Sequence, residues 1–298
     1  MDGRPVGRAR AAIDATLPQP GERRLARAAA KARRNRRQLA VSAVSTVVVL
    51  GLLVTLVVTS EGWPNVRATF FSWTDFKASF PDVLKGFWLD VKLFVIVEIA
   101  VLILGLVVAL ARISRTPALF PVRLLSAIFV DVLRGVPTIL VVYLIGFGVP
   151  ALMLSGLPTD PVVLGGIALT LAYSAYVGEV YRAGIESVHP SQDAAARSLG
   201  LSRSQSLRYV VVPQAVRRVV PPLLNDFIGL QKDTALIALI GPVEAFRQAQ
   251  IDTSATFNFT PYVAAALIFV AFTIPLARLT DWLNERSRRR RLVAGIAP

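Results

Sequence analysis

Long uncharged runs are the feature that most constrains the fold of this chain. From Leu39 to Thr59 no residue is charged, and this run has about the 20 residues that a helix needs to cross a bilayer. Further apolar runs lie at about 87–111, 124–149, 162–180, 219–240 and 261–283. Inside hydrocarbon, a helix satisfies its own backbone polar groups. The sequence therefore predicts an all-α integral membrane protein with six transmembrane helices.

Composition excludes several kinds of functional site. Hydrophobic residues make up 54% of the chain and charged residues 17%, whereas about 25% of the residues of a soluble domain are charged. No cysteine is present, which excludes a disulfide or a thiolate site, and the single histidine, His189, excludes a histidine cluster. No Gly-Lys pair occurs, so a phosphate-binding P-loop is excluded as well. We expect no catalytic residue, no metal site and no cofactor bound by this chain.

The distribution of basic residues predicts the topology. The net charge is +14, and arginines cluster before Leu39 and again at 286 and 288–291. Such clusters mark the cytoplasmic ends of spanning helices, so we expect both termini in the cytoplasm. No aromatic residues lie among these arginines, which argues against nucleic-acid binding.

The chain is expected to divide into five parts. Residues 1–38 form a basic cytoplasmic tail, disordered or weakly helical. Residues 39–59 form an extra first helix, retained as an anchor and not cleaved as a signal peptide. An extracytoplasmic loop, 60–85, leads to the main core of spanning helices, 86–286. A basic cytoplasmic C-terminus, 287–298, ends the chain.

The 191–213 segment is too polar for the bilayer and is predicted to form two short helices. Ser191 is a predicted N-cap, and Gly200 stands where a left-handed residue would end the first helix. Ser202 opens the second helix, with a glutamine three residues later that completes a capping box. Pro213 is expected to end that helix, because its ring cannot continue the hydrogen-bond ladder.

Three consecutive alanines give the first of these helices a flat surface, which suits docking against another protein. Their spacing from Gly200 and Pro213 resembles the E-A-A-x-x-x-G-x9-I-x-L-P loop of ABC importer membrane subunits, in their polar amino-acid permease branch. The family's glutamate falls on Ala194, Asp193 lies one residue earlier, and valine replaces the isoleucine and leucine. The resemblance implies that an ATPase subunit docks here, on Asp193, Ala194, Ala195, Ala196, Gly200, Leu201 and Pro213.

The resemblance covers roughly residues 86–286 and includes further short motifs. Arg134-Gly135-Val136-Pro137-Thr138 is similar to the family's R-G-x-P element, and residues 175–184 are similar to its A-Y-x-x-E-x-x-R-x-G. Lys232-Asp233-Thr234 continues the pattern in register. A match to this family implies a type I ABC importer permease bundle of five spans with cytoplasmic coupling helices, to which the first span and the basic tail are additions.

The resemblance also implies partners and a substrate class. A second permease subunit, identical or a sibling, would pair with this chain, and a dimer of ABC ATPase subunits would bind ATP and Mg. An extracytoplasmic solute-binding protein would deliver a polar amino acid, with glutamate, glutamine or a basic amino acid as candidates. The chain would lie in the plasma membrane of a bacterium, surrounded by membrane lipid.

Charged residues inside the predicted spans are costly unless they face a bundle interior, a partner or a pathway. Glu98 has no charged residue at i±3 or i±4, so it needs a distant partner or a proton. Two pairs at i,i+3, Asp131 with Arg134 and Glu179 with Arg182, are expected to meet on one helix face. A structural lock and a solute pathway or gate both remain open for Glu98, Arg134, Gly135, Pro137, Glu179, Arg182, Lys232, Asp233 and Thr234.

Two other classes of function remain open. A non-transporting membrane scaffold or sensor would use the basic termini and the 191–213 segment to bind partners. A secondary transporter, which needs no ATPase, would be expected to show discontinuous helices in corresponding halves, and the sequence shows no such repeat. Co-purification with an ATPase separates an importer subunit from both.

Overall fold

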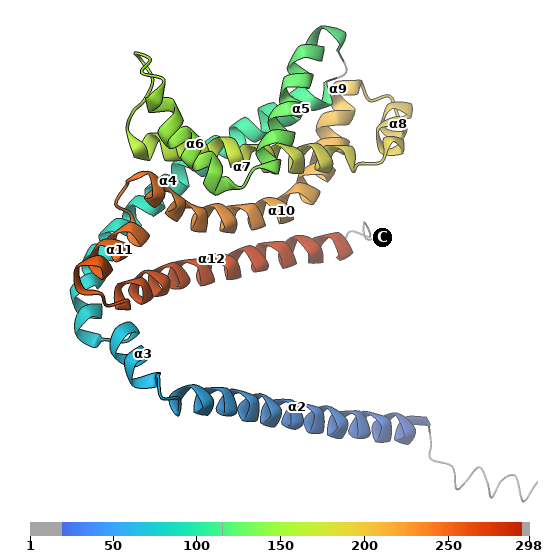
Figure 1. The fold of residues 1–298 in the computed structure, drawn as a ribbon. Helices are drawn as coiled ribbons and strands as arrows, with labels where there is room; N and C mark the ends of the chain where they lie inside the picture. Colours follow the sequence, from blue (N-terminus) through green and yellow to red (C-terminus); the bar gives the residue numbers. More distant parts are fainter. Residues whose placement is uncertain (1–19, 115, 294–298) are drawn as a thin grey trace, which may run out of the picture. The chain divides into compact units, whose positions relative to one another are not determined.

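The structure is a computed structural model that describes residues 20–114 and 116–293 (Figure 1). The chain divides into two compact units, residues 1–66 and 67–298. The described residues are helical apart from turns and short links and contain no β-strand. The predicted all-α class is therefore confirmed.

The described part of the first unit consists mainly of α2 (Pro20–Val58). Its stretch Asn35–Val58 has the length and hydropathy of a membrane span, and every residue in it is exposed, as suits a helix that faces lipid. The helix predicted at 39–59 is present, and it is long and apolar enough to be a membrane span. The helix begins earlier than predicted, because the alanines and arginines of 20–38 are good helix formers. Residues 1–19 of the predicted tail lie outside the described residues.

The helix α4 (Trp73–Ile113) begins inside the stretch 60–85 that the sequence predicts to be a loop. Ser72 caps it by accepting a hydrogen bond from the backbone N–H of Asp75 at 3.4 Å. Buried side chains at helical spacing run from the polar start of α4 into its apolar part, and these are Ser79, Val83, Gly86, Phe87 and Asp90. The prediction of a loop is therefore wrong in its local structure, because α3 (Trp63–Phe70) and the first turns of α4 occupy it.

The predicted third span, 124–149, is two helices, α5 (Phe120–Gly135) and α6 (Thr138–Ala151), preceded by the 3-10 turn η1 (Pro117–Leu119). The two parts are bent by 110°. Val136 between them is extended, with φ −104° and ψ 130°, as the residue before a proline prefers to be. One continuous helix is therefore a wrong prediction, because the apolar run hides the break before Pro137.

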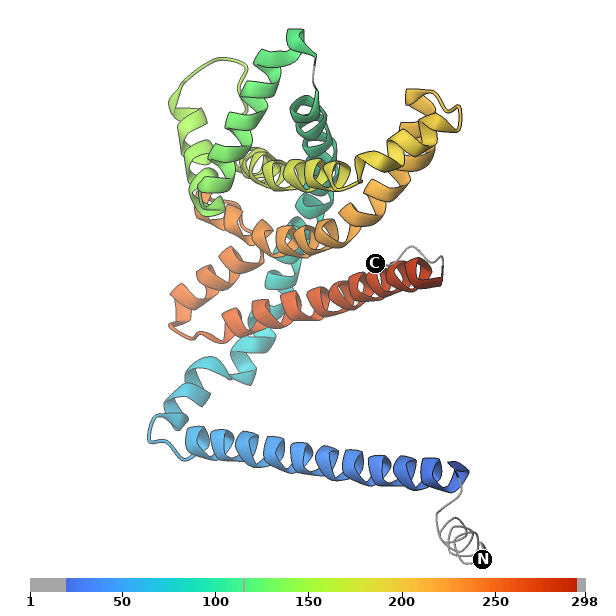
Figure 2. The ribbon, with the colours of Figure 1, turned by 90° about the vertical axis from the view of Figure 1, so that its right-hand side faces the viewer.

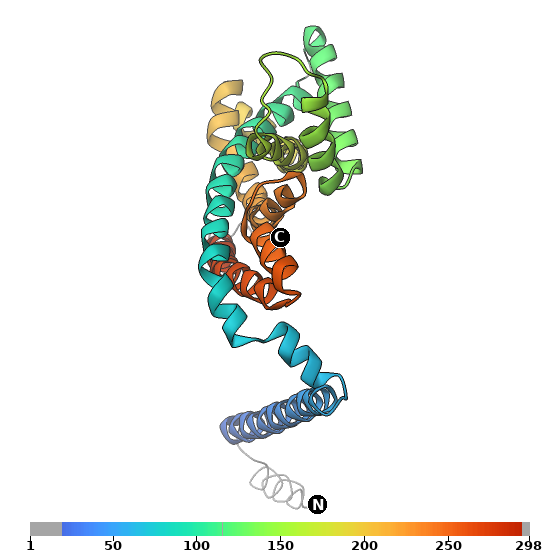
Figure 3. The same ribbon diagram turned by 60° about the vertical axis from the view of Figure 1, so that its left-hand side comes forward.

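At the centre of the second unit, α7 (Pro161–Glu186) contacts α4, α5, α6 and α10 (Figure 3). Asp160 caps α7 by accepting a hydrogen bond from the backbone N–H of Val163 at 2.9 Å. Gly178 lets α4 approach closely, since a Cβ there would lie 3.2 Å from the backbone oxygen of Gly105. The buried core around α7 includes Leu93, Val97, Leu164, Leu169, Leu230 and Ile237.

Beyond α7 the chain forms α8 (Pro190–Ser198), α9 (Arg203–Ser206), the π-helical turn η2 (Leu207–Val211) and α10 (Val212–Asp233). Pro213 does not end the helix, contrary to the prediction. The N–H of Val212 bonds to the carbonyl of Leu207, five residues back, and this wider turn accommodates a proline that has no N–H. Figure 2 shows α8 and α9 at one end of the second unit.

Three further elements complete the described chain, namely the 3-10 helix η3 (Thr234–Ile240), α11 (Ala245–Thr256) and α12 (Thr260–Val293). The predicted span at 261–283 falls within α12, which is long and apolar enough to cross a membrane. Among the described residues four helices are long and apolar enough to cross a membrane, or five if α5 and α6 count as one bent span. The predicted fifth span, 219–240, falls on α10 and η3, which are not among them.

Candidate functional site

The first helix of the 191–213 segment begins two residues earlier than predicted. Its N-cap is His189, whose Nδ1 accepts a hydrogen bond from the backbone N–H of Ser191 at 3.2 Å. Ser191 is therefore not the cap, because Pro190 occupies the first helical position, where its fixed φ favours the start of a helix. The sequence assigns no role to His189, which here caps α8.

The joint between α8 and α9 confirms the predicted glycine geometry. Gly200 has a φ of +90°, a conformation that glycine adopts at little cost. Its N–H bonds to the carbonyl of Arg197 at 3.0 Å, and that of Leu201 bonds to Ala196 at 3.3 Å. A Cβ added at Gly200 would have no atom within 4 Å. The glycine is therefore required by backbone conformation and not by packing.

The predicted capping box at the start of α9 is also confirmed. The Ser202 hydroxyl accepts a hydrogen bond from the backbone N–H of Gln205 at 3.3 Å, and the Gln205 side chain accepts from the N–H of Ser202 at 2.8 Å. Both ends of the link between α8 and α9 are thus fixed by local hydrogen bonds.

The alanine surface is confirmed in part. Ala194 and Ala195 are exposed, whereas Ala196 is buried. Leu199, 85% exposed, extends the apolar surface beyond the alanines. Asp193 faces the other way and accepts a hydrogen bond from the buried Ser206 of α9. The exposed part of α8 therefore contains two small apolar residues, Ala194 and Ala195, beside the exposed Arg197, and its acidic residue serves the contact with α9.

Side-chain contacts also tie this segment to the helices on either side of it. Arg218 of α10 donates a hydrogen bond to the backbone oxygen of Ser187 at the end of α7. Val188, Val211 and Ala215 form a buried cluster between the same elements. The segment is thus anchored to both α7 and α10.

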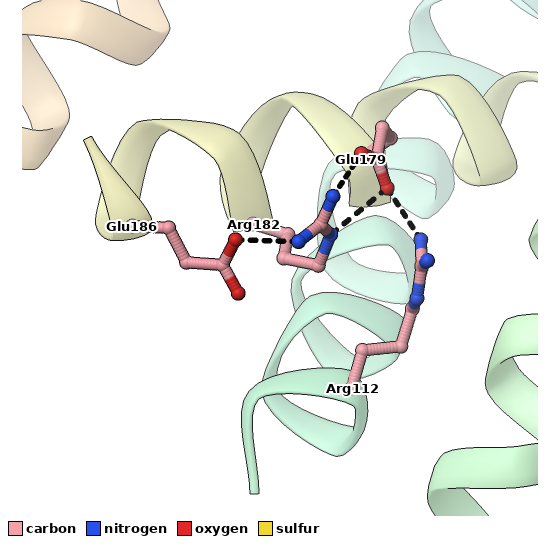
Figure 4. A network of polar contacts seen from close by, with 4 residues as sticks. All are labelled: Arg112, Glu179, Arg182 and Glu186. Carbon is pink, nitrogen blue, oxygen red and sulfur yellow. Dashed lines mark hydrogen bonds and ion pairs between the residues drawn. The ribbon is translucent and has the colours of Figure 1, made fainter.

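Four charged side chains form a network at the adjoining ends of α4 and α7 (Figure 4). The predicted pair is confirmed, because Arg182 donates to Glu179 at 2.5 and 3.1 Å. Arg112 of α4 binds the same carboxylate, and Glu186 accepts from Arg182 at 2.5 Å. The sequence reading missed both additions. The i,i+4 spacing from Arg182 identifies Glu186, but nothing local identifies Arg112.

The second predicted pair is not formed. No ion pair joins Asp131 and Arg134 within the part of the chain that the structure describes. The Arg134 guanidinium instead lies over the ring of Tyr176, 5.8 Å from its centroid. Gly135 and Pro137 lie at the break between α5 and α6, so the R-G-x-P element marks a bend in the backbone.

The other predicted polar residues lie along α4, α7 and α10. Glu98 is half-buried, and the charged neighbour that acts on it is another carboxylate, Asp226. Asp233 accepts a hydrogen bond from the hydroxyl of Tyr173 at 2.8 Å. The sequence reading missed Asp226 and Tyr173, since contacts between helices leave no local pattern. These side chains form a half-buried acidic group between the three helices.

Lys232 and Thr234 have different surroundings although they are close in sequence. Lys232 is exposed and lines a largely apolar cavity of about 540 Å³ with Phe246, Tyr262 and Phe269. Thr234 is buried, and its hydroxyl donates to the carbonyl of Gln231 at 2.9 Å. The motif Lys232-Asp233-Thr234 therefore does not form one site.

Asp90 and Glu244 form a buried carboxyl pair that was not predicted from the sequence. Glu244 caps α11 by accepting hydrogen bonds from the N–H groups of Phe246 and Arg247, both at 2.7 Å. Asp90 of α4 accepts from the N–H of Ala245 at 3.3 Å. Burial raises the pKa of Glu244, and the two backbone N–H groups oppose this. Asp90 carries the same signal as Glu98, because no charged residue lies at i±3 or i±4.

Among the described residues, no three histidine, cysteine, aspartate or glutamate side chains gather in a way that could hold a metal ion. The arrangement places a pair of short, hydrogen-bonded helices at one end of α7 and α10, with acidic groups further along the same two helices.

Comparison with known proteins gives consistent matches. The family described as binding-protein-dependent transport system inner membrane component matches residues 101–289. The probable glutamine ABC transporter permease protein GlnM of Bacillus subtilis (strain 168) is 33% identical over 209 residues, which are 70% of this chain and 94% of the relative. The arginine transport system permease protein ArtQ of the same organism is 32% identical over 206 residues, which are 68% and 92% of the two chains.

Solved structures agree. The crystal structure of an amino acid ABC transporter with histidines has a TM-score of 0.66 at 32% identity, over 72% of this chain and 98% of that one. The MetNI methionine ABC transporter, with a TM-score of 0.54 at 18% identity over 69% of this chain and 95% of that one, shares the fold. The chain therefore belongs to the binding-protein-dependent transport system inner membrane components, as an amino-acid ABC importer permease of a bacterial inner membrane.

Proposed function

We propose that this chain couples ATP hydrolysis by a separate ATPase subunit to the passage of a polar amino acid through the membrane. The observation that carries the proposal is the geometry of the 191–213 segment. Two short helices meet at an angle fixed by Gly200, and Ala194 and Ala195 present a small exposed surface. The family membership and the names of the relatives support this assignment.

Transmission of force needs a rigid connection, and the segment has one. The hydrogen bond from Ser206 to Asp193 holds α9 to α8, and the bond from Arg218 to Ser187 holds the base of α10 to α7. A displacement of α8 is therefore passed to α7 and α10 and not absorbed in a loose loop. These two helices carry Tyr173, Asp226 and Asp233, so movement at the docking end reaches the acidic group.

The same proposal includes the partners of an importer. A dimer of ATPase subunits supplies ATP and Mg, because the chain has no P-loop of its own. A second permease subunit completes the pathway, and a solute-binding protein outside the membrane delivers the amino acid. The family's description as binding-protein-dependent supports the last of these.

Within the polar amino acids, the charges favour a cationic or neutral substrate over glutamate. Glu98 and Asp226 lie near each other between α4 and α10, and no ion pair neutralises either within the described ranges. A second negative charge on the substrate would be repelled in a partly desolvated site. Relatives named for glutamine and arginine transport are consistent with this order.

The test is ATP-driven uptake by the assembled transporter in proteoliposomes. We expect labelled arginine or glutamine to accumulate when the partner ATPase, the binding protein and ATP are present, and glutamate to accumulate less. The chain with Ala195→Arg, which places bulk and charge on the docking face, is the matched negative control. Uptake that persists without an ATPase subunit would instead support a secondary transporter, and absence of uptake with all partners would support a scaffold.

The proposed orientation has a test of its own. Reporter tags placed before Leu39 and after Arg291 should both be cytoplasmic, and a tag near Asp75 should be external, because arginine clusters remain inside. An external N-terminus would contradict this orientation without bearing on the ATPase contact.

A further inference from the structure

The helix α2 carries an arginine cluster that the transport function does not explain. The family matches residues 101–289, so α2 lies outside the matched region. Arginine occupies positions 33, 34, 36 and 37, directly before the uncharged run that starts at Leu39. We name these four residues the arginine cluster. Arg36 and Arg37, whose side chains the structure describes, are both exposed.

We propose that the arginine cluster binds the anionic phospholipid headgroups of the leaflet in which α2 enters the bilayer. This inference does not depend on the proposed transport function, because it concerns a helix outside the matched permease region.

The position of the cluster along α2 places it at headgroup depth. The helix is continuous from Pro20 to Val58, and its candidate span begins at Asn35. With a rise of about 1.5 Å per residue, positions 33 and 37 lie within about 3 Å of that point along the axis. Each guanidinium offers a planar set of donors that matches phosphate oxygens. Helix positions 33, 34, 36 and 37 thus lie at the depth of the lipid phosphates.

Charge gives the preference for anionic over zwitterionic lipid. Glu22 is the only acidic residue between positions 20 and 38, so the positive charge of this segment is not neutralised within it. A basic residue next to an anionic surface gains about 1 kcal/mol, which is about a fivefold preference. Several arginines at one depth therefore enrich anionic lipid around this helix.

The distance of an arginine from the membrane surface distinguishes binding to lipid from binding to a soluble acidic partner. Three further arginines of α2, at 23, 24 and 27, lie about 12 to 18 Å along the axis from Asn35. This separation exceeds the Debye length of about 8 Å at physiological salt. Lipid headgroups therefore act on the arginine cluster and only weakly on this distal set, whereas a soluble acidic protein or a nucleic acid would contact the distal set at least as strongly.

The experiment uses the full-length chain reconstituted in mixed phosphatidylethanolamine and phosphatidylglycerol. After purification in mild detergent, mass spectrometry gives the ratio of the two lipids that remain bound. We expect phosphatidylglycerol to be enriched over the bulk mixture. R34Q/R36Q/R37Q should lose this enrichment, by up to about fivefold for each arginine removed. The matched variant R23Q/R24Q/R27Q, which loses the same charge from the same helix, should retain it.

A third variant separates charge from other effects of substitution. R34K/R36K/R37K keeps the charges at headgroup depth and should keep most of the enrichment, and it also serves if the glutamine variant fails to insert. An equal or greater loss of enrichment in the distal variant would overturn the proposal in favour of a soluble acidic partner. Loss in the lysine variant as large as in the glutamine variant, or no enrichment in the unaltered chain, would also overturn it.

Discussion

The hydroxyl of Ser206 on α9 donates a hydrogen bond of 2.5 Å to Oδ1 of Asp193 on α8. Ser206 is fully buried, so this bond satisfies a polar group that has no access to water. In the related permeases' loop pattern the acidic residue would fall on Ala194. Here Asp193 supplies a carboxylate from the preceding position, and this carboxylate binds Ser206 within the segment while Ala194 and Ala195 stay exposed.

Replacement of Asp193 by alanine should therefore loosen α8 from α9. The buried Ser206 hydroxyl would lose its acceptor, at a cost of about 1–3 kcal/mol, and membrane insertion should not change because no spanning helix is affected. Hydrogen exchange of the 191–213 segment and co-purification with the ATPase measure the effect. Asp193→Asn, which keeps an acceptor oxygen, should be milder. Wild-type exchange in both variants would show that this bond does not hold the two helices.

The network around Glu179 should stabilise the contact between α4 and α7. Glu179→Gln removes the carboxylate that both Arg112 and Arg182 bind, and leaves two positive charges close together. Their side chains are 16% and 28% exposed, so the loss, after allowance for solvent screening, should be about 1–3 kcal/mol of unfolding free energy.

Thermal unfolding in detergent measures this loss. Glu186→Gln is the matched control, because that carboxylate is 52% exposed and bonded to one arginine, and its removal should cost less than about 1 kcal/mol. Equal costs for the two variants would mean that the network acts as an ordinary surface cluster.

Features encoded within a few residues could be predicted from the sequence. The capping box at Ser202 and the positive φ at Gly200 depend on backbone geometry that those side chains themselves favour, and both are present. The cap of α8 differs from the prediction because Pro190 and His189 together give an earlier start than Ser191.

Features that depend on contacts between distant segments could not be predicted. The bend before Pro137 lies inside an apolar run, where average hydropathy does not register a change of direction. In the sequence, Arg112 indicates the end of a span, and nothing near it indicates that its side chain contacts Glu179. The approach of Asp90 to α11 requires Gly86, where a Cβ would lie 2.7 Å from the backbone carbon of Glu244. None of these pairings leaves a spacing pattern in the chain.

The buried cap of α11 should make stability depend on pH. Burial raises the pKa of Glu244 above its ordinary value near 4.5, so the folded chain holds this proton to a higher pH than the unfolded chain does. The contribution to stability is therefore present at low pH and is lost as pH rises from about 4.5 through the raised pKa. Glu244→Gln should flatten this part of the profile of melting temperature against pH.

The control for this titration is Glu186→Gln, which removes a half-exposed carboxylate and should leave the slope unchanged. An unaltered slope in Glu244→Gln would place the pH dependence on another group, and Asp90, which lies against the same helix start, would be the next to replace.

The angle between α8 and α9 is open to the most direct test, because at Gly200 conformation and packing are separated. A Cβ there would contact nothing within 4 Å, yet φ is +90°. Gly200→Val should therefore cost about 1 kcal/mol or more through backbone strain alone, enough to tilt one short helix against the other.

Gly200→Asn is the matched control, because it adds a side chain at the same exposed position but tolerates a left-handed backbone. We expect the valine variant to reach the membrane at normal abundance, to bind the ATPase more weakly and to uncouple hydrolysis from uptake, while the asparagine variant stays close to wild type. If both variants bind the ATPase and couple hydrolysis to uptake as well as the wild type does, the contact with the ATPase does not depend on the angle at Gly200. In that case α8 would dock independently of α9.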